Sequence, residues 1–306
     1  TMNRSYRSIE AKLRVDIDLA HILGFKQGMY PSDSVLKQYF AELKIKQLKS
    51  IMYELVNELR SLGALKCDIM ALDSTPVPAY YRPPTEKGEA PTDPDARWGY
   101  SKSKDGWYYG YKAQIMVDTE TQIPLICKVT PANVSDQKMV RPFVWILKKL
   151  GIVPNYTLLD KGYDSGNNHL ELREHLGSIG LIAPNYRGSK KKTIRPMMKK
   201  MGKRLFKQLT LEKFIPIKTR KKAYRTSSSL MLNIKKYKFI YNDRISVERH
   251  FSSLKGQMNL EDHRMKGLKN VYKHTLLQCI AYLIVVLASE RLGIPNAKRS
   301  LRFFQN

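Results

Sequence analysis

The chain of 306 residues carries 54 Lys and Arg against 27 Asp and Glu, which gives a formal net charge of +27. This length is sufficient for one sizeable core with a smaller unit attached. So large a basic excess repels itself unless a polyanion offsets it, and nucleic acid is therefore the first partner to consider.

The basic charge is concentrated in one segment. Between Arg187 and Ile240 there are 19 Lys or Arg and a single acid, Glu212, so this segment supplies 18 of the 27 net charges. The alternative is a basic surface that only aids solubility or contacts anionic membranes. The local clustering favours a nucleic-acid contact instead.

The cysteines and histidines predict neither a disulfide framework nor a structural zinc site. The three cysteines are far apart, none lies in a C-x-x-C pair, and the six histidines show no ligand spacing with them. This cysteine usage fits a cytosolic protein.

Neither a signal peptide nor a membrane span is predicted. The first thirty residues alternate charged and apolar side chains, and the chain opens Thr1-Met2, which leaves its natural N-terminus open. The longest apolar run, Leu276–Ala288, is shorter than the roughly 20 residues that a bilayer requires. We therefore expect a buried helix there, no membrane partner, and a cytoplasmic, nucleoid-associated protein.

Residues 1–62 are predicted to be a small all-helical N-terminal region. Apolar residues recur at helical spacing, Pro31-Ser32-Asp33-Ser34 resembles a cap, and a second periodic stretch covers Leu43 to Leu62. Such a unit could read DNA ends, or it could be a packing cap on the main domain. The sequence leaves both interpretations open.

Residues 63–186 change to an alternation of strands and helices. In chain order we predict a strand over 67–77 with a turn at Asp-Ser-Thr-Pro, an exposed loop over 76–95, a hairpin of strands 107–117 and 123–129, a helix over 134–150, a strand over 156–160, a helix over 167–177 and a strand over 179–184. This order predicts an α/β fold with a mixed sheet covered by helices.

The remainder of the chain contains the basic segment and a helical end. Residues 187–235 form a basic insertion that lacks regular apolar periodicity, and a closing apolar helix is predicted over Val271–Leu292. We therefore assign residues 63–186 and 236–306 to one catalytic domain that is interrupted by the insertion.

Two aspartates are predicted to meet at one edge of the sheet. Asp73 is expected at the end of the first strand and Asp160 at the end of the strand after the hairpin. If the two strands are parallel neighbours, both carboxylates emerge at the same edge, where open α/β sheets place their sites.

A third carboxylate comes from a helix predicted over residues 241–255. At about 100° per residue, a polar stripe lies within roughly 60° on this helix and an apolar stripe lies beside it. The polar stripe consists of Tyr241, Arg244, Glu248 and Lys255, and the apolar stripe of Val247, Phe251 and Leu254. The apolar stripe would pack on the sheet and direct Glu248 to its edge, although the polar one could also be an ordinary solvated face.

Clustered carboxylates suit hard divalent cations. Mg²⁺, or Mn²⁺ in its place, prefers such oxygen ligands. Two ions about 4 Å apart could activate an attacking oxygen and stabilise a leaving oxygen at a phosphodiester. Arg244 and Lys255 would then contact phosphates.

These residues resemble a known family. The stretches ALDSTPV, YGYKAQIMVDTETQIPLICKVTPANVSDQ, LLDKGYDS and YNDRISVERHFSSLKG, with a following R-x-x-G, are similar to bacterial insertion-sequence transposases of the DDE class. Tyr241, Arg244, Glu248 and Lys255 match the Y-x2-R-x3-E-x6-K signature of one group at every spacing. The resemblance covers about Cys67 to Leu292.

The resemblance implies a ribonuclease-H-like fold and Mg²⁺-dependent cleavage at transposon ends, followed by joining to target DNA. Asp73, Asp160 and Glu248 fall on the catalytic, metal-binding acids. Double-stranded DNA with terminal inverted repeats is the implied partner, bound by a homodimer in the DNA complex. The implied DNA contacts are Tyr241, Arg244 and Lys255, to which we add Arg249, Arg264 and Lys161.

Several alternatives remain open at this stage. Asp164 and Asp68 compete with the chosen aspartates, but a helix cap explains Asp164 and a position at the start of its strand explains Asp68. The insertion has no Trp, so Phe206, Phe214 or Tyr224 would have to stack on a flipped base, or would instead anchor local packing. The cleavage route through a DNA hairpin is therefore undecided.

Two other functions compete with an active transposase. One is a catalytically inactive, transposase-derived DNA-binding protein, which a missing acid would favour. The other is a general ribonuclease-H-like nuclease, which would cleave without preference for an end sequence.

Overall fold

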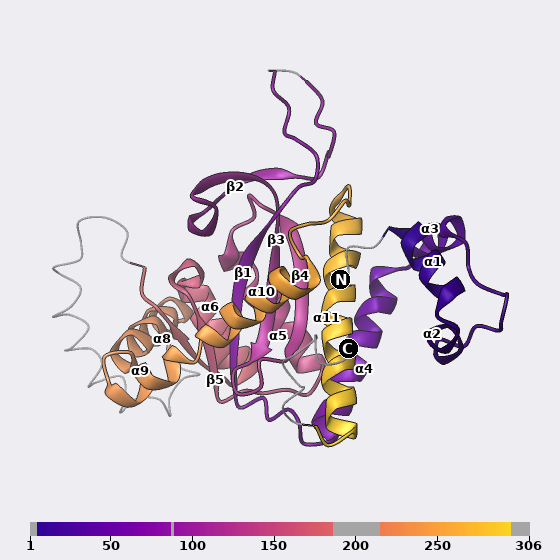
Figure 1. Cartoon of the computed structure of the whole chain (residues 1–306). Coiled ribbons are helices and arrows are strands. Elements are labelled where there is room, and N and C mark those ends of the chain that lie inside the picture. The colour runs from indigo at the N-terminus through magenta and orange to yellow at the C-terminus, as the bar shows by residue number, and fades with distance from the viewer. Residues whose placement is uncertain (1–4, 87–88, 186–214, 295–306) are drawn as a thin grey trace.

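The computed structural model describes residues 5–86, 89–185 and 215–294 (Figure 1). Its centre is a six-stranded mixed sheet in the order β2-β3-β1-β5-β6, with β4 also paired to β3. The strands are β1 (Ile69–Pro78), β2 (Arg97–Ser101), β3 (Gly106–Asp118), β4 (Pro124–Pro131), β5 (Tyr156–Leu159) and β6 (Ile179–Ile182). The predicted mixed sheet with flanking helices is confirmed, whereas β2 was not predicted.

The sheet divides into an antiparallel and a parallel half. Strand β3 pairs antiparallel with β1, β2 and β4, while β1, β5 and β6 run parallel. The predicted hairpin corresponds to β3 and β4. Residues 134–150 form a 3₁₀ turn at Asp136–Lys138 and the helix α5 (Val140–Lys149) instead of one continuous helix.

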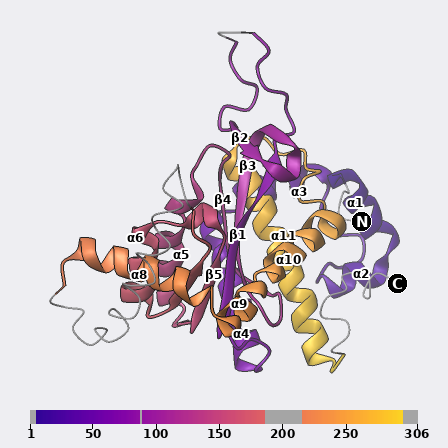
Figure 2. The ribbon, with the colours of Figure 1, turned by 90° about the vertical axis from the view of Figure 1, so that its left-hand side faces the viewer.

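Helices cover both faces of the sheet (Figure 2). Helices α10 (Ile245–Met258) and α11 (Leu268–Arg291) lie on one face, and α5 lies on the other. Because both faces are covered, the central strands are buried almost throughout instead of alternating between core and solvent. The apolar stripe of α10 packs into this core as predicted.

The N-terminal region is helical, as the sequence indicates. It contains α1 (Tyr6–Val15), α2 (Ile17–Ile22), α3 (Asp33–Glu42) and α4 (Ile45–Ser61), and the Ser32 hydroxyl caps α3 by accepting from the Val35 N–H at 3.3 Å. Helices α1 to α3 project to one side of the sheet domain, whereas α4 packs along α11 (Figure 1). The division of the chain at residue 62 stays a prediction.

Helix α4 belongs to the main core. Its buried side chains Leu48, Met52, Val56 and Leu59 join the cluster that surrounds the sheet. Helix α11 has the length and apolar composition of a membrane span, but two thirds of its most apolar window is buried inside the protein. The expected buried helix is therefore found, and it begins at Leu268, three residues before the predicted start at Val271.

Part of the basic insertion has regular structure, which the sequence analysis did not anticipate. Residues 217–231 form α8, whereas Phe206 and Phe214 lie outside the described residues. The buried face of α8 includes Thr226, Ser228 and Ser229, so its packing produces no apolar periodicity. The Ser228 hydroxyl accepts a hydrogen bond from the Ile182 N–H at 3.0 Å, which joins α8 to β6.

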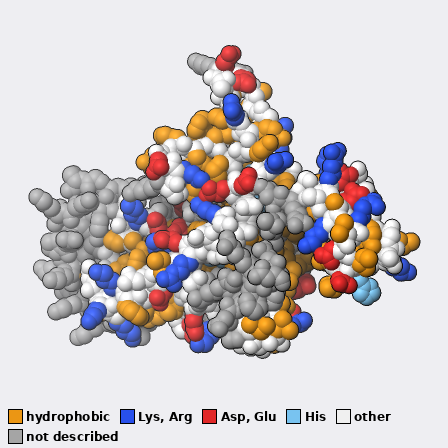
Figure 3. Space-filling model, in the orientation of Figure 1, with side chains coloured by type: hydrophobic (Ala, Val, Ile, Leu, Met, Phe, Trp, Pro, Cys, Tyr) orange, Lys and Arg blue, Asp and Glu red, His pale blue; other side chains and the backbone are white. Residues whose placement is uncertain are grey.

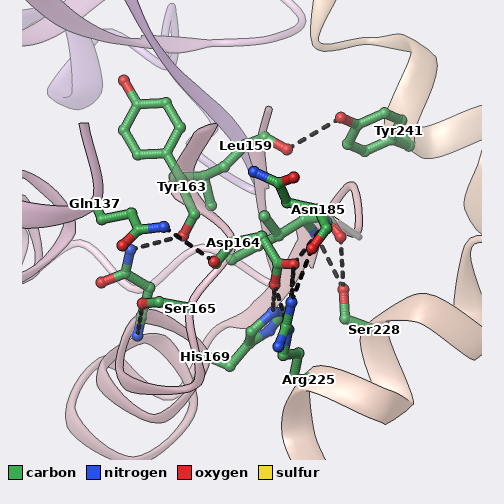
Figure 4. Close-up of polar contacts among 12 residues, drawn as sticks. Gln137, Leu159, Tyr163, Asp164, Ser165, His169, Asn185, Arg225, Ser228 and Tyr241 are labelled. Atoms are coloured by element: carbon green, nitrogen blue, oxygen red, sulfur yellow. Dashed lines mark hydrogen bonds and ion pairs between the residues drawn. The ribbon is translucent and has the colours of Figure 1, made fainter. Parts of the chain in front are cut away.

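Asp164 holds α8 against the sheet domain (Figure 4). Its carboxylate accepts from Arg225 of α8 at 2.6 Å and from the Asn185 N–H at 2.7 Å, with His169 at 3.4 Å. The interpretation of Asp164 as a helix cap was wrong, because Ser165 caps α6 (Gly166–Leu170). Burial alone would raise the pKa of Asp164, but these hydrogen bonds lower it to about 2.

We predict that Asp164→Asn reduces the free energy of unfolding at pH 7 by about 2 kcal/mol. The folded pKa lies nearly two units below the ordinary 3.8, and each unit corresponds to about 1.4 kcal/mol. A lowered pKa stabilises the fold above the unfolded value, so the difference between the two proteins should shrink as pH falls from about 4 to about 2. Urea unfolding at a series of pH values measures it.

The exposed Asp68 provides the control, because Asp68→Asn removes the same charge outside this network. Equal free energies of unfolding for wild type and Asp164→Asn at pH 7 would contradict the proposal that Asp164 holds α8 against the sheet domain.

Candidate active site

Asp73 and Asp160 follow the last paired residues of two neighbouring parallel strands. The β1–β5 register runs from Ile69 with Tyr156 to Leu72 with Leu159, and the two aspartates come next in each strand. The predicted parallel neighbours are therefore found, and the two carboxylates leave the sheet at the same edge.

Strand β1 does not end at Asp73 as expected. It continues to Pro78 because β3 remains paired to it, with Asp73 opposite Ile115. Beyond Leu72 the other side of β1 has no paired strand, and Pro76 is tolerated at such an edge. The Asp-Ser-Thr-Pro sequence therefore does not form a turn. It lies where β1 changes from a central strand, paired on both sides, to an edge strand paired only with β3.

The Asp73 carboxylate is mostly buried and has two donors. It accepts from the Ser74 N–H at 2.8 Å and from Arg244 at 2.8 Å. Burial raises the pKa of Asp73 to about 7, and the nearby charges of Asp160 and Asp136 add to this, while Ser74 and Arg244 oppose it. The Asp73 carboxyl therefore lies in a surrounding that disfavours its charged form, chiefly because it is buried.

Asp160 begins the short turn Lys161–Tyr163. Its side chain accepts the Gly162 N–H, and a Cβ built at Gly162 would lie 3.0 Å from its Oδ1 atom. A larger residue at this position would press on the carboxylate. The glycine thus lets the turn fold closely around Asp160.

Arg244 joins the other two site elements. Its guanidinium donates to Asp73 at 2.8 Å and to Glu248 at 2.7 Å. The pair with Glu248 spans one turn of α10, while Asp73 comes from β1. One planar cation therefore lies between two carboxylates, as its forked donors allow.

The helix predicted over 241–255 is interrupted. Tyr241 lies in the last turn of α9 (Lys235–Asn242), the chain turns at Asp243, and α10 begins at Ile245. At this turn the backbone hydrogen bonds join residues three apart, and α9 ends there. Tyr241 and Glu248 therefore do not lie on one face of a continuous helix. Tyr241 instead donates to the carbonyl of Leu159 at 3.0 Å, next to Asp160 (Figure 4).

Lys255 is not brought to the carboxylates. It pairs with Glu261 at 2.7 Å, and Lys104 of the β2–β3 turn pairs with the same carboxylate. The expected positions Lys161, Arg249 and Arg264 are exposed, without an ion pair inside the described part of the chain. Figure 3 shows acidic and basic side chains side by side on this face.

Asp136 is a further acid at the site that sequence reasoning missed. It follows β4, and its Oδ2 atom would lie 3.6 Å from a Cβ built at Gly162, beside Asp160. Its Oδ1 atom accepts from Gln114 at 2.8 Å and from Lys112 at 3.1 Å. The signal was present in the stretch TPANVSDQ, where an acid follows a strand, but no spacing rule pointed to it.

A buried hydrogen-bond chain supports Asp136. The Gln114 amide donates to Asp136, and its oxygen accepts from the Tyr163 hydroxyl at 2.7 Å. Both Gln114 and Tyr163 are fully buried. This chain links the turn after Asp160 to β3 and to the turn of Asp136.

Carboxylate oxygens, which Asp73, Asp160 and Glu248 would offer, are ligands that suit a hard divalent cation. Among residues 5–86, 89–185 and 215–294, no three acidic, His or Cys side chains are grouped to hold a metal ion. The guanidinium of Arg244 provides the positive charge between Asp73 and Glu248 in this arrangement.

We predict that Tyr163→Phe lowers the free energy of unfolding by about 1–3 kcal/mol. The substitution leaves the buried Gln114 oxygen without its donor, and an unpaired buried acceptor costs that much. Chemical denaturation measures the loss. Tyr39→Phe on the exposed face of α3 is the control and should be neutral, and an equally neutral Tyr163→Phe would disprove the role of the hydroxyl.

Comparison with known proteins agrees with this geometry. A family model described as the transposase DDE domain matches residues 66–284, which include both aspartates, Arg244 and Glu248. No curated protein and no solved structure matched the chain. The match covers most of the sequence, and the mixed sheet with flanking helices is consistent with a ribonuclease-H-like transposase domain. The chain belongs to the transposase DDE domain family.

Proposed function

We propose that this protein is an active DNA transposase that cuts phosphodiester bonds at transposon ends and joins the freed 3′-OH to target DNA. The observation that carries the proposal is the shared position of Asp73 and Asp160 beside the end of the β1–β5 pairing, with Glu248 linked to Asp73 through Arg244. Family membership supports the transposase class.

Asp73, Asp160 and Glu248 would hold Mg²⁺, or Mn²⁺ in its place. Bound there, divalent ions would supply Lewis-acid stabilisation to the attacking and leaving oxygens. Burial raises the pKa of Asp73, and the neighbouring acids add to this. A bound cation would favour the charged form of this carboxyl.

The residues of the chain itself would position the acids and the DNA. Tyr241 fixes the end of β5 through the Leu159 carbonyl, and Arg244 keeps Asp73 and Glu248 from repelling each other. The exposed Lys161, Arg249 and Arg264 would contact backbone phosphates. Lys255 could do so only after leaving Glu261.

The proposed chemistry has two displacements. In the first, a water oxygen bonds to phosphorus at the transposon end and loses a proton to solvent, the bond from phosphorus to the 3′ oxygen breaks, and that oxygen takes up a proton from solvent to leave as a 3′-OH. In the second, the oxygen of the freed 3′-OH bonds to a target phosphorus and releases its proton to solvent, while the displaced target 3′ oxygen takes up a proton. The partners would be double-stranded DNA with terminal inverted repeats and a second copy of the chain, in the cytoplasm at the nucleoid.

The two competing functions have less support. A catalytically inactive DNA-binding derivative would be free to lose an acid, and here Asp73, Asp160 and Glu248 are all retained. A general nuclease of the same fold would cleave without regard to the end sequence. A cleavage assay that compares the native end sequence with a scrambled one therefore distinguishes the three functions: a transposase cuts only the native end, a general nuclease cuts both, and an inactive derivative cuts neither.

We predict that Asp73→Ala and Glu248→Gln each reduce Mg²⁺-dependent cleavage of an end-containing duplex more than about a hundredfold, while DNA binding is largely retained. Loss of even an outer partner of a metal ligand typically costs about 10- to 100-fold. Cleavage is measured on labelled duplexes that carry the native end or a scrambled end, and binding is measured by mobility shift.

Asp68→Ala is the matched control, because it removes an exposed carboxylate at the opposite end of β1. Normal cleavage by Asp73→Ala or Glu248→Gln would rule out the assigned site. Equal cleavage of native and scrambled ends by the wild type would indicate a general nuclease.

A further inference from the structure

A basic groove lies between α4, β4 and α5, separate from the carboxylate site. Its volume is about 840 Å³. The cations that line it are Lys46, Lys49, Lys128, Lys138, Arg141 and Lys149, and the lining also contains Trp145 and Tyr53. No acidic side chain is among the described lining residues. We call this feature the α4–α5 groove.

The cations form two facing stripes. On α5, Arg141, Trp145 and Lys149 are each four residues apart and therefore lie on one helical face. On α4, Lys46 and Lys49 are three residues apart and share a face in the same way. At 1.5 Å per residue the α5 stripe is about 12 Å long, which is enough to follow a short stretch of a nucleic-acid backbone.

Positive charge in the groove is poorly compensated. Arg141 is paired with Glu171 at 3.7 Å, whereas the five lysines have no ion pair to a carboxylate among the described residues. Burial lowers the pKa of Lys49, and repulsion from Lys128 lowers it further. An anion in the groove would relieve this repulsion.

Trp145 provides an aromatic surface in the same groove. Its side chain is 59% exposed, and the Lys149 Nζ atom lies 4.1 Å from its ring centroid. Exposed aromatic side chains in basic grooves stack on unpaired bases. The groove therefore combines contacts for phosphate and for base.

The remaining segments of the chain are poor candidates to fill the groove. Residues 186–214 and 295–306 are both strongly basic, and a second copy of the chain carries the same +27 net charge. Like charges disfavour all three occupants. A polyanion is the complementary partner.

The groove also adjoins the catalytic edge. The turn Asp136–Lys138 places Asp136 beside Asp160, while Lys138 two residues later lines the groove. A strand in the groove could therefore continue toward the carboxylates.

We propose that the α4–α5 groove binds an unpaired DNA strand, with backbone phosphates along Lys46, Lys49 and Lys149 and a base stacked on Trp145. This inference rests on the proposed function for the choice of nucleic acid over an acidic peptide. It assigns to the protein a second DNA contact beyond the carboxylate site.

The first experiment reads occupancy of the groove directly. In full-length protein with Trp98→Phe and Trp107→Phe, Trp145 is the only tryptophan, so its fluorescence reports binding there. We expect a single-stranded oligothymidylate of twelve nucleotides to quench it in EDTA, where metal-dependent cleavage cannot occur. No quenching, or quenching only by a duplex or by polyglutamate, would overturn the proposal.

The second experiment separates the groove from general basic charge. Lys46→Gln with Lys149→Gln should weaken oligothymidylate binding roughly tenfold and reduce the salt slope by about 1.4, because each lost single-strand phosphate contact removes about 0.7. Lys44→Gln with Lys148→Gln removes the same charge from exposed positions on or beside the same helices and should leave both values unchanged. Equal effects of the two pairs would overturn the proposal.

These readouts are independent of catalysis. If the wild type fails to cut transposon ends but its groove binds the single strand, the proposed function fails and the groove assignment stands. If ends are cut normally and Trp145 does not respond, the groove assignment alone fails.

Discussion

The candidate site depends on where the pairing of β1 with β5 stops. Hydrogen bonding between these parallel strands ends at Leu72 and Leu159, and each is followed directly by an aspartate. Because β3 still holds the other side of β1, Asp73 is carried by a rigid extended strand while Asp160 enters a tight turn. The paired residues of the two strands are 87 positions apart in the sequence, and the sheet register brings the two aspartates together with little freedom.

Charge compensation over long sequence separations completes the site. Asp73 is paired with Arg244 from the start of α10, Asp136 with Lys112 of β3, and Asp164 with Arg225 of α8. Buried charges are costly unless they are paired and hydrogen-bonded, so each pair ties a separate segment to this part of the sheet. The acids at this edge therefore contribute to the fold as well as to the proposed chemistry.

The large net charge is distributed in a way that suits DNA. On the face covered by α10, acidic and basic side chains are intermixed (Figure 3). In the α4–α5 groove the lining charges have one sign only. Intermixed acidic and basic side chains can bind cations and position phosphates. A groove lined only by positive charges attracts a polyanion more strongly than such a mixed surface does.

The sequence by itself determined the helix and strand alternation, the family resemblance and the three acids, because hydrophobic periodicity and motif spacing are local properties. The burial of Val247, Phe251 and Leu254 likewise followed from spacing within one helix. Three features were decided only by the tertiary structure: the break between Tyr241 and Arg244, the pairing of Lys255 with Glu261, and the approach of Asp136 to Asp160. In each case a partner from a distant segment takes part: Leu159 for Tyr241, Lys104 for Glu261, and the turn after Asp160 for Asp136. No local pattern contains the energies of such contacts.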